Sequence, residues 1–270
     1  MSIQYKISVI TINKNNAPGL KKTCLSVITQ TSKEFEWIII DGASDDNSVD
    51  VIKQYSENIN FWISEPDSGI YNAMNKGIEH STGEYLLFLN SGDFLLYPWT
   101  LQDVIDEIKT LKYADVYFSN AVYSTYQVRQ YPKNINLNFF IRGGSLNHQN
   151  CLIKRELFKH RLYDENYPVI ADWYFFLKEI LDQDISFIHI LTNIAMYDMN
   201  GISATYSNRL QSERRKILKK LNISGRNKFF LWSILKTAKY ILPYGLFLAL
   251  RSFRDYLNNH QPVKQSKSYN

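Results

Sequence analysis

The chain has 270 residues, of which 45% are hydrophobic and 14% aromatic, the composition of a globular protein with one large core. Its two cysteines, Cys24 and Cys151, lie far apart, which excludes a disulfide framework and a cysteine-based metal site. The net charge of +5 hides an asymmetry, because residues 209–270 hold 14 Lys and Arg against two acids, whereas residues 1–208 carry an excess of acids. A basic tail on an acidic body predicts contact with an anionic partner.

Strands and helices alternate through the first hundred residues. The first residues, MSIQYKISVI, lead directly into a strand, so no signal peptide is expected. Strands are predicted at residues 6–13, 36–44, 60–64 and 84–89, and helices at 17–29, 48–56 and 70–79. Continuous apolar strands separated by helices indicate a parallel sheet that is covered on both faces. In such sheets, ligands bind at the carboxyl ends of the strands.

Polar and acidic groups gather where these strands end. The ends are Thr11-Ile12-Asn13, then Asp41, then Glu65-Pro66-Asp67, then Ser91-Gly92-Asp93. The last group follows the apolar run LLFL, and a carboxylate at the rim of a buried strand is costly unless something pairs with it. Either a hydrogen-bonded loop or a bound cation satisfies this requirement.

The middle of the chain is less regular. The pattern predicts strands at residues 115–120 and 184–190, and an alternating, exposed strand at 121–131. A helix is predicted at 169–181, with Asp172 in its first turn.

Residues 225–258 mix aromatic and aliphatic side chains with lysines and arginines. Their uncharged stretch, 240–250, is far shorter than the roughly 20 apolar residues of a membrane-spanning helix. We expect a pair of interfacial helices that face anionic lipid, or alternatively an ordinary helical hairpin that packs on the body. The predicted organisation is an α/β domain at 1–208, a basic amphipathic helical segment at 209–258 and a disordered tail at 259–270.

Four segments in this order resemble the family 2 glycosyltransferases: SVITIN (8–13), IIDGASDD (39–46), SEPDSGIYNAMNKG (64–77) and SGD (91–93). The resemblance covers about residues 5–200. It implies the GT-A fold, an α/β domain with a mainly parallel central sheet. It also implies transfer of a sugar from a nucleotide diphosphate sugar with inversion at the anomeric carbon.

The resemblance makes Asp93 a ligand of Mn²⁺ or Mg²⁺ in the DXD-type motif, with Ser91 and Gly92 lining the donor site. Hard cations prefer carboxylate, and such sites often combine one or two carboxylates with phosphate oxygens and water. Ser91 occupies the motif's first acidic position, so metal affinity without nucleotide is expected to be weak. The alternative is that Asp93 caps a following helix.

The same resemblance implies that Asp41 accepts a hydrogen bond from the ring N–H of a pyrimidine base. Thr11 and Asn13 would then lie beside the base and the ribose. This favours a UDP-sugar, and GDP- and dTDP-sugars stay open. The alternative is that Asp41 only orders the turn at Gly42.

Asn72, Asn75 and Lys76 share one helix face by their spacing, which predicts contacts with the donor sugar or phosphates. A solvated helix face is the alternative.

An inverting transfer needs a base for the acceptor hydroxyl, and Asp172 matches the family's position for it. Ala171 stands where the family motif often has Glu. Trp173 is expected to stack on a sugar ring, and His148 and Gln149 to contact the acceptor or the diphosphate. The alternatives are a simple helix N-terminal acid and a structural histidine.

The leading hypothesis is an enzyme of surface polysaccharide (O-antigen, capsule or exopolysaccharide) biosynthesis. It would act on a lipid-linked saccharide and be cytoplasmic, peripheral on the inner face of the cell membrane. A non-catalytic nucleotide-sugar-binding or scaffold subunit is the alternative. A nicotinamide-dependent oxidoreductase is excluded because no GxGxxG follows the first strand. A nucleic-acid partner is not expected, because the basic residues of the tail alternate with apolar ones.

Overall fold

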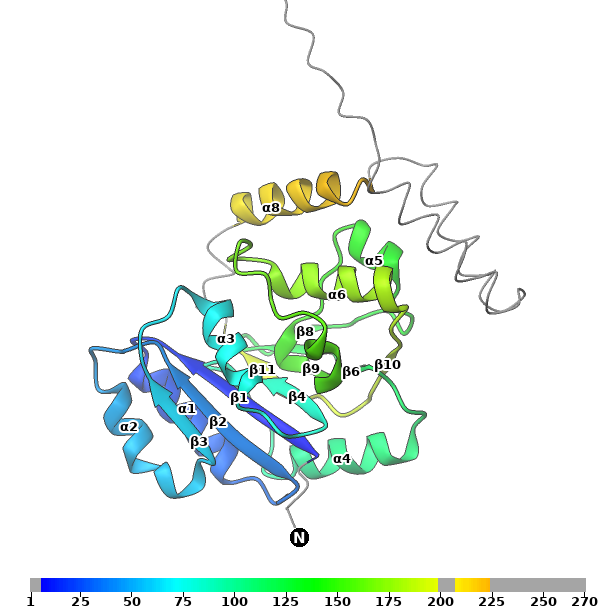
Figure 1. The fold of residues 1–270 in the computed structure, drawn as a ribbon. Coiled ribbons are helices and arrows are strands. Elements are labelled where there is room, and N and C mark those ends of the chain that lie inside the picture. The colour runs from blue at the N-terminus through cyan, green and yellow to red at the C-terminus, as the bar shows by residue number, and fades with distance from the viewer. Residues whose placement is uncertain (1–5, 199–206, 224–270) are drawn as a thin grey trace, which may run out of the picture. The chain divides into compact units, whose positions relative to one another are not determined.

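The computed structural model describes residues 6–198 and 207–223. The chain divides into two compact units, Met1–Leu210 and Gln211–Asn270. The first unit is built on a seven-stranded sheet in the order β10-β6-β9-β4-β1-β2-β3 (Figure 1). Its strands are β1 (Ile7–Asn13), β2 (Phe35–Asp41), β3 (Phe61–Ser64), β4 (Tyr85–Phe88), β6 (Val116–Phe118), β9 (Cys151–Lys154) and β10 (Phe187–His189).

The large sheet is parallel except for β9, which runs antiparallel to both β4 and β6. All seven residues of β1 are buried, as expected for a central strand with helices on both sides. The register pairs Asn13 with Asp41 and Asp41 with Ser64, so the carboxyl ends of β1, β2 and β3 lie level. The predicted mainly parallel α/β sheet is confirmed.

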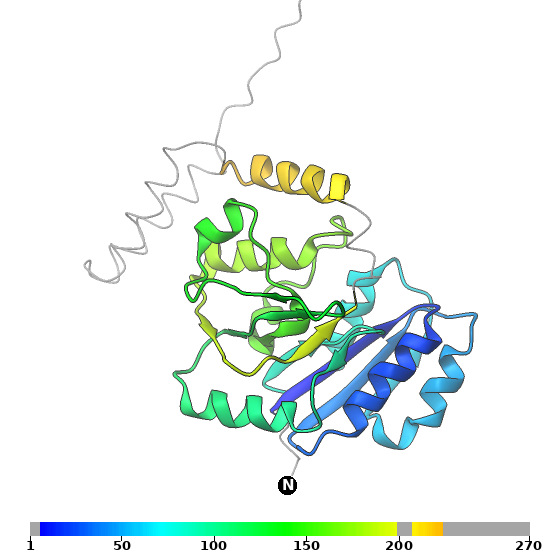
Figure 2. The ribbon, with the colours of Figure 1, turned by 180° about the vertical axis from the view of Figure 1, so that it is seen from behind.

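Helices cover both faces of this sheet (Figures 1 and 2). On one face, α1 (Ala17–Ile28), α2 (Ser48–Gln54) and α4 (Thr100–Thr110) bury apolar side chains against Val9, Trp37 and Leu87. On the other, α3 (Ile70–Glu79) packs so closely that a Cβ on Gly77 would collide with Ile10. Each fully buried aliphatic side chain contributes about 1.5–3 kcal/mol to this core.

The helix that carries Asp172, α6 (Ala171–Gln183), is anchored by an aromatic cluster. Phe175 stacks on Phe158 with ring centroids 4.5 Å apart, and Tyr163 contacts both Phe175 and Phe88. Phe88 is the last residue of β4, so the cluster ties the start of α6 to the sheet. Such ring pairs add about 0.5–1.5 kcal/mol each beyond the burial of their area.

A smaller four-stranded sheet has the order β5-β11-β7-β8. Its strands are β5 (Phe94–Leu95), β7 (Ala121–Tyr123), β8 (Val128–Arg129) and β11 (Ala195–Tyr197). β5 follows Asp93 directly, which brings the end of β11 next to that residue. The remaining elements are α5 (Leu137–Ile141), the 3₁₀ turns η1 (Ser56–Asn58), η2 (His148–Asn150) and η3 (Arg155–Lys159), and α8 (Ser207–Lys220).

The seven elements predicted before residue 90 are present, although the second strand ends at Asp41 instead of residue 44. The predicted exposed strand at 121–131 is wrong, because its first residues are buried in β7 and a turn separates them from β8. Five helices and strands had not been predicted, namely α4, β5, α5, β9 and β11. No helix in the described ranges is long and apolar enough to cross a membrane. The predicted interfacial segment at 225–258 and the tail at 259–270 lie outside the described residues.

Candidate active site

Asp41, at the end of β2, is fully buried and surrounded by the protein's own donors. Its carboxylate accepts hydrogen bonds from the Asn13 amide (2.7 Å), from the Ser44 hydroxyl (2.6 Å) and backbone N–H (2.9 Å), and from the Ser64 hydroxyl (2.6 Å). Burial opposes ionisation, but these hydrogen bonds outweigh it and lower the pKa of Asp41. The carboxylate therefore orders the turn that follows β2, and contact with a base would require it to exchange one of these donors.

Thr11 does not reach the ligand edge with its side chain. It is fully buried, and its hydroxyl accepts a 3.1 Å hydrogen bond from the indole N–H of Trp37. The prediction that its side chain flanks a base is corrected, because Thr11 points into the layer between the sheet and α1. Asn13 is different: its amide nitrogen binds Asp41, while its Oδ1 is buried and has no hydrogen-bond partner among the described residues. A buried carbonyl oxygen in this state is an acceptor for a ligand N–H or O–H.

Asp93 is 3% exposed. Its Oδ2 accepts from the Gln149 amide (2.9 Å) and its Oδ1 from the backbone N–H of Asp198 (2.8 Å). Burial raises the pKa of Asp93 to about 6, although both hydrogen bonds oppose the rise. No helix begins directly after Asp93, since β5 follows at once and α4 starts only at Thr100, so the alternative that it caps a helix is wrong.

The turn before Asp93 is built by Ser91 and Gly92. Gly92 has φ +105°, a left-handed conformation that favours glycine, and its N–H donates to the Thr23 hydroxyl (3.0 Å). The side chain of Asn16 donates to the carbonyl of Ser91 (3.1 Å), which ties the turn to the start of α1. A Cβ on Gly92 would lie 3.0 Å from Oδ2 of Asp198, so the carboxyl group of Asp198 packs against this turn.

A divalent cation fits this corner only together with other ligands. Across residues 6–198 and 207–223, no group of three or more His, Cys, Asp and Glu residues is arranged to hold a metal ion. However, Asp93 and Asp198 bring two carboxylates together, and the charge of Asp198 raises the pKa of Asp93. One or two carboxylates completed by phosphate oxygens and water are a usual Mg²⁺ or Mn²⁺ site.

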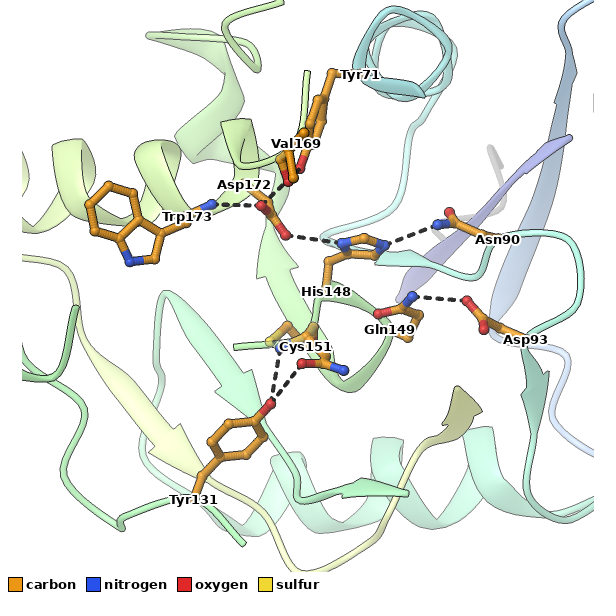
Figure 3. Close-up of polar contacts among 11 residues, drawn as sticks. Tyr71, Asn90, Asp93, Tyr131, His148, Gln149, Cys151, Val169, Asp172 and Trp173 are labelled. Atoms are coloured by element: carbon orange, nitrogen blue, oxygen red, sulfur yellow. Dashed lines mark hydrogen bonds and ion pairs between the residues drawn. The ribbon is translucent and has the colours of Figure 1, made fainter. Parts of the chain in front are cut away.

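Asp172 is held at the start of α6 by three donors (Figure 3). Its Oδ1 accepts from the Tyr71 hydroxyl (2.9 Å) and the backbone N–H of Trp173 (2.8 Å), and its Oδ2 lies 3.2 Å from Nδ1 of His148. Burial raises the pKa of Tyr71, and the negative charge of Asp172 raises it further, so the phenol stays a donor. The carboxylate is thereby fixed in one orientation.

Trp173 and Gln149 do not have the roles predicted for them. Trp173 is 1% exposed, its indole N–H donates to the Gly144 carbonyl (3.0 Å), and its ring points away from the Asp172 carboxylate (Figure 3). It therefore has no face to offer a sugar. Gln149 is 2% exposed and binds Asp93, so it supports that carboxylate instead of contacting an acceptor.

The predicted donor-binding face of α3 contacts the chain itself. Asn75 is 6% exposed, and its amide donates to the Tyr163 carbonyl (3.0 Å) and to Glu165 (3.1 Å) while accepting from the Tyr163 N–H (3.0 Å). Asn72 also donates to Glu165 (3.1 Å), and Lys76 forms an ion pair with Glu65 (2.6 Å). Residues 163–165 therefore cover Asn75, whereas Asn72 and Lys76 are half-buried and contact acids of the chain itself.

Four residues of the site had not been predicted from the sequence, namely Asn16, Tyr71, Asn90 and Asp198. Asn90 and Tyr71 stand inside or beside the recognised segments, so their position was a usable signal. No sequence signal marked Asp198, because only the pairing of β11 with β5 brings it to Asp93.

The fold and this site together define a class of protein. A parallel sheet with helices on both faces, a buried acid after its fourth strand and a second acid at the start of α6 are the frame of a GT-A glycosyltransferase. The family described as Glycosyl transferase family 2 matches residues 8–183, more than half of the chain. The chain therefore belongs to the family 2 glycosyltransferases.

Individual relatives are similar over different lengths. An uncharacterized glycosyltransferase of Mycobacterium tuberculosis is 39% identical over 103 residues, which cover 38% of this chain and 39% of that relative. This chain thus spans about two fifths of the length of that relative. A PGL/p-HBAD biosynthesis glycosyltransferase of Mycobacterium bovis is 27% identical over 217 residues, 78% of this chain and 82% of the relative.

Solved structures share the fold. Staphylococcus aureus TarS (residues 1–349) in complex with UDP superposes with a TM-score of 0.61 at 19% identity, over 72% of this chain and 60% of that one. The mannosyltransferase PcManGT from Pyrobaculum calidifontis, in complex with GDP-Man and Mn²⁺, also superposes with a TM-score of 0.61. Its identity is 14%, over 96% of this chain and 82% of that one.

Proposed function

We propose that the protein is an inverting glycosyltransferase that moves a sugar from a nucleoside diphosphate sugar to a saccharide hydroxyl, with Asp172 as the base. The observation that carries the proposal is the arrangement of two acids around η2. His148 contacts Asp172, and the next residue, Gln149, binds Asp93 (Figure 3). In this proposal, one short turn holds both the base for the acceptor and the carboxylate for the diphosphate end of the donor.

The orientation of Asp172 suits proton abstraction. A carboxylate offers about four lone-pair sites, and Tyr71, the Trp173 N–H and His148 take three of them. The remaining lone-pair site of Asp172 accepts the proton of the acceptor hydroxyl while the hydroxyl oxygen bonds to the anomeric carbon. The bond to the diphosphate oxygen breaks on the opposite face of the sugar, which inverts the configuration.

For the donor, we propose a UDP-sugar first. The unpartnered Oδ1 of Asn13 is an acceptor for a base or ribose group, and Asp41 lies beside it. Asp93 and Asp198 would hold Mn²⁺ or Mg²⁺ together with the diphosphate. When bound, the cation supplies Lewis-acid stabilisation of the charge on the departing phosphate oxygens. Fold neighbours solved with UDP, and with GDP-Man and Mn²⁺, support a nucleotide-sugar donor and a divalent cation.

For the acceptor, we propose a lipid-linked saccharide in surface polysaccharide biosynthesis, with the protein at the inner face of the cell membrane. The name of the Mycobacterium bovis relative, a PGL/p-HBAD biosynthesis glycosyltransferase, supports a glycolipid-related pathway. The basic and apolar composition of residues 225–258 supports contact with anionic lipid.

A non-catalytic nucleotide-sugar-binding or scaffold subunit is the second candidate. Ser91 and Ala171 favour it, because both stand where the resembling family often has an acid. The fixed Asp172 favours catalysis, since a binding subunit has no use for a base.

The two candidates separate in a two-stage experiment. Calorimetric titration of the full chain with UDP, GDP, dTDP and CDP, each with and without Mn²⁺, identifies the nucleotide; we expect UDP to bind only with the cation. Transfer from the matching nucleotide sugars to lipid-linked saccharides then tests turnover. Nucleotide binding without turnover on any acceptor would favour the scaffold role, and no binding at all would contradict both.

A further inference from the structure

The imidazole of His148 is held on three sides. Its Nδ1 lies 3.2 Å from Oδ2 of Asp172, and its Nε2 lies 3.2 Å from the side-chain nitrogen of Asn90. The ring of Phe88 packs edge-on against it, with centroids 6.2 Å apart and planes at 83°. Such a ring has no freedom to follow a substrate, which argues against the acceptor contact predicted from the sequence.

The neighbours of His148 also decide where its proton sits. An ionised Asp172 only accepts hydrogen bonds, so the Nδ1 that faces it must carry a proton. On the other side, the Asn90 amide presents its nitrogen to Nε2, and in this orientation it donates to an unprotonated Nε2. In this arrangement the imidazole is neutral and protonated on Nδ1, and it donates a hydrogen bond to Asp172.

The residue after His148 gives this contact a wider consequence. Gln149 donates to Asp93 (2.9 Å), and both residues belong to the turn η2. Because consecutive residues bind the two acids, the backbone of η2 sets the separation of the base from the cation-binding carboxylate. A catalytic group displaced by about 1 Å can lose on the order of 100-fold in rate.

We propose that His148 is a positioning residue for Asp172: its neutral, Nδ1-protonated imidazole, oriented by Asn90, fixes the base relative to the donor-binding carboxylate Asp93. This inference rests on the proposed function for its effect on rate. Its structural part, the proton on Nδ1, does not depend on turnover.

The first test is nuclear magnetic resonance of the full chain with ¹⁵N-labelled histidine. Long-range proton–nitrogen correlations distinguish the tautomers, and the His148→Gln variant identifies the His148 signals among those of the five histidines. We expect a protonated Nδ1 and a bare Nε2. The Asn90→Asp variant, which places an acceptor opposite Nε2, should protonate both nitrogens. A bare Nδ1 in the wild type would overturn the proposal even if no acceptor were ever found.

The second test compares two substitutions, each of which keeps an amide nitrogen in the place of one of the two ring nitrogens. In His148→Asn the amide nitrogen can occupy the place of Nδ1 and still donate to Asp172, whereas in His148→Gln the nitrogen lies in the place of Nε2. We expect His148→Gln to lower kcat about 10- to 100-fold with an unchanged donor KM, and His148→Asn to stay close to wild type.

Two kinetic outcomes would count against positioning. Equal losses of kcat in both variants would mean that the ring matters only for packing. A raised donor KM in both would place His148 on the diphosphate instead. Absence of transfer by the wild-type chain would reject the proposed function, and the tautomer measurement would then decide on the His148 contact alone.

Discussion

Gln149 donates a 2.9 Å hydrogen bond to Asp93, and this bond explains how an apolar strand can be followed by a buried acid. Together with the backbone N–H of Asp198, it satisfies both oxygens of a carboxylate that water hardly reaches. The hydrogen bonds do not cancel the cost of burial, because the pKa of Asp93 still rises to about 6. The remaining cost is the part that a cation would relieve.

Replacing the base should abolish transfer without affecting the donor. Asp172→Asn keeps the size of the side chain but cannot take a proton, so we expect kcat to fall by about 10²- to 10⁴-fold. The affinity for UDP with Mn²⁺, measured by calorimetry, should not change. Asp106→Asn, on the exposed side of α4, is the matched control and should behave as wild type. Wild-type turnover by Asp172→Asn would remove this residue as the base.

The raised pKa of Asp93 predicts that stability depends on pH. The folded chain binds this proton more tightly than the unfolded chain, whose carboxyl has a pKa near 3.8, so stability is lost as pH rises from about 4 through 6. The shift of about two units corresponds to about 3 kcal/mol. Asp93→Asn should remove this dependence. Its NH2 group cannot accept from Gln149, so the Gln149 amide has to turn its oxygen toward it, and a neutral contact replaces a charge-assisted one at a cost of about 1 kcal/mol. The variant should therefore be about 2 kcal/mol more stable than wild type at pH 8.

Urea unfolding between pH 4.5 and 8 measures this difference. The gain of Asp93→Asn over wild type should shrink toward pH 4.5, and the variant should lose cation-dependent UDP binding. A constant difference across the whole range would contradict the assignment of the pH dependence to Asp93.

Gly92→Ala should destabilise the turn that presents Asp93. A side chain at φ +105° is strained by about 1–3 kcal/mol, and the new Cβ would also lie 3.0 Å from the Asp198 carboxylate. Gly69→Ala is the matched control, since Gly69 has φ +138° with open space around it. We expect the larger fall in melting temperature at Gly92. Equal falls would show that strain alone acts and that the contact with Asp198 is unimportant.

Asn75→Asp tests whether α3 supports the fold or binds the donor. The new carboxylate would face Glu165 and lose the donor to the Tyr163 carbonyl, so we expect a loss of about 1–3 kcal/mol in unfolding free energy. UDP affinity of the folded variant should stay unchanged. A weaker affinity without a loss of stability would restore the donor-binding role predicted from the sequence.

The basic segment predicts binding to anionic membranes. Five Gln substitutions within 225–258 should release the full chain from phosphatidylserine vesicles in a sedimentation assay, because each basic residue near the surface contributes about 1 kcal/mol. The substituted residues are Lys228, Lys236, Lys239, Arg251 and Arg254. The matched control replaces five exposed lysines of the first unit, namely Lys21, Lys33, Lys53, Lys109 and Lys112. Equal release by the two sets, or none by the first, would contradict a specific membrane role for the segment.

The sequence by itself determined the central sheet and the location of the site. The strands that contain Val9, Ile39 and Leu87 are apolar on both faces, and that pattern has one stable solution, a parallel sheet between helices. Because parallel strands share one carboxyl edge, Asn13, Asp41 and Asp93 were placed at that edge from their order alone. The local helix periodicity also placed Asp172 in the first turn of its helix.

Only the tertiary structure decided what each of these side chains contacts. Trp173 and Thr11 were expected at a ligand surface, but packing turns both inward, and sequence spacing carries no information on that choice. Asp198 reaches Asp93 through the pairing of β11 with β5, a contact between residues about a hundred positions apart. Local propensity acts over a few residues, whereas the partners of a buried acid are set by the closure of the whole chain. The sequence therefore predicted three acids of the site, Asp41, Asp93 and Asp172, but not Asp198. The fold alone showed that His148 and Gln149 hold two of them.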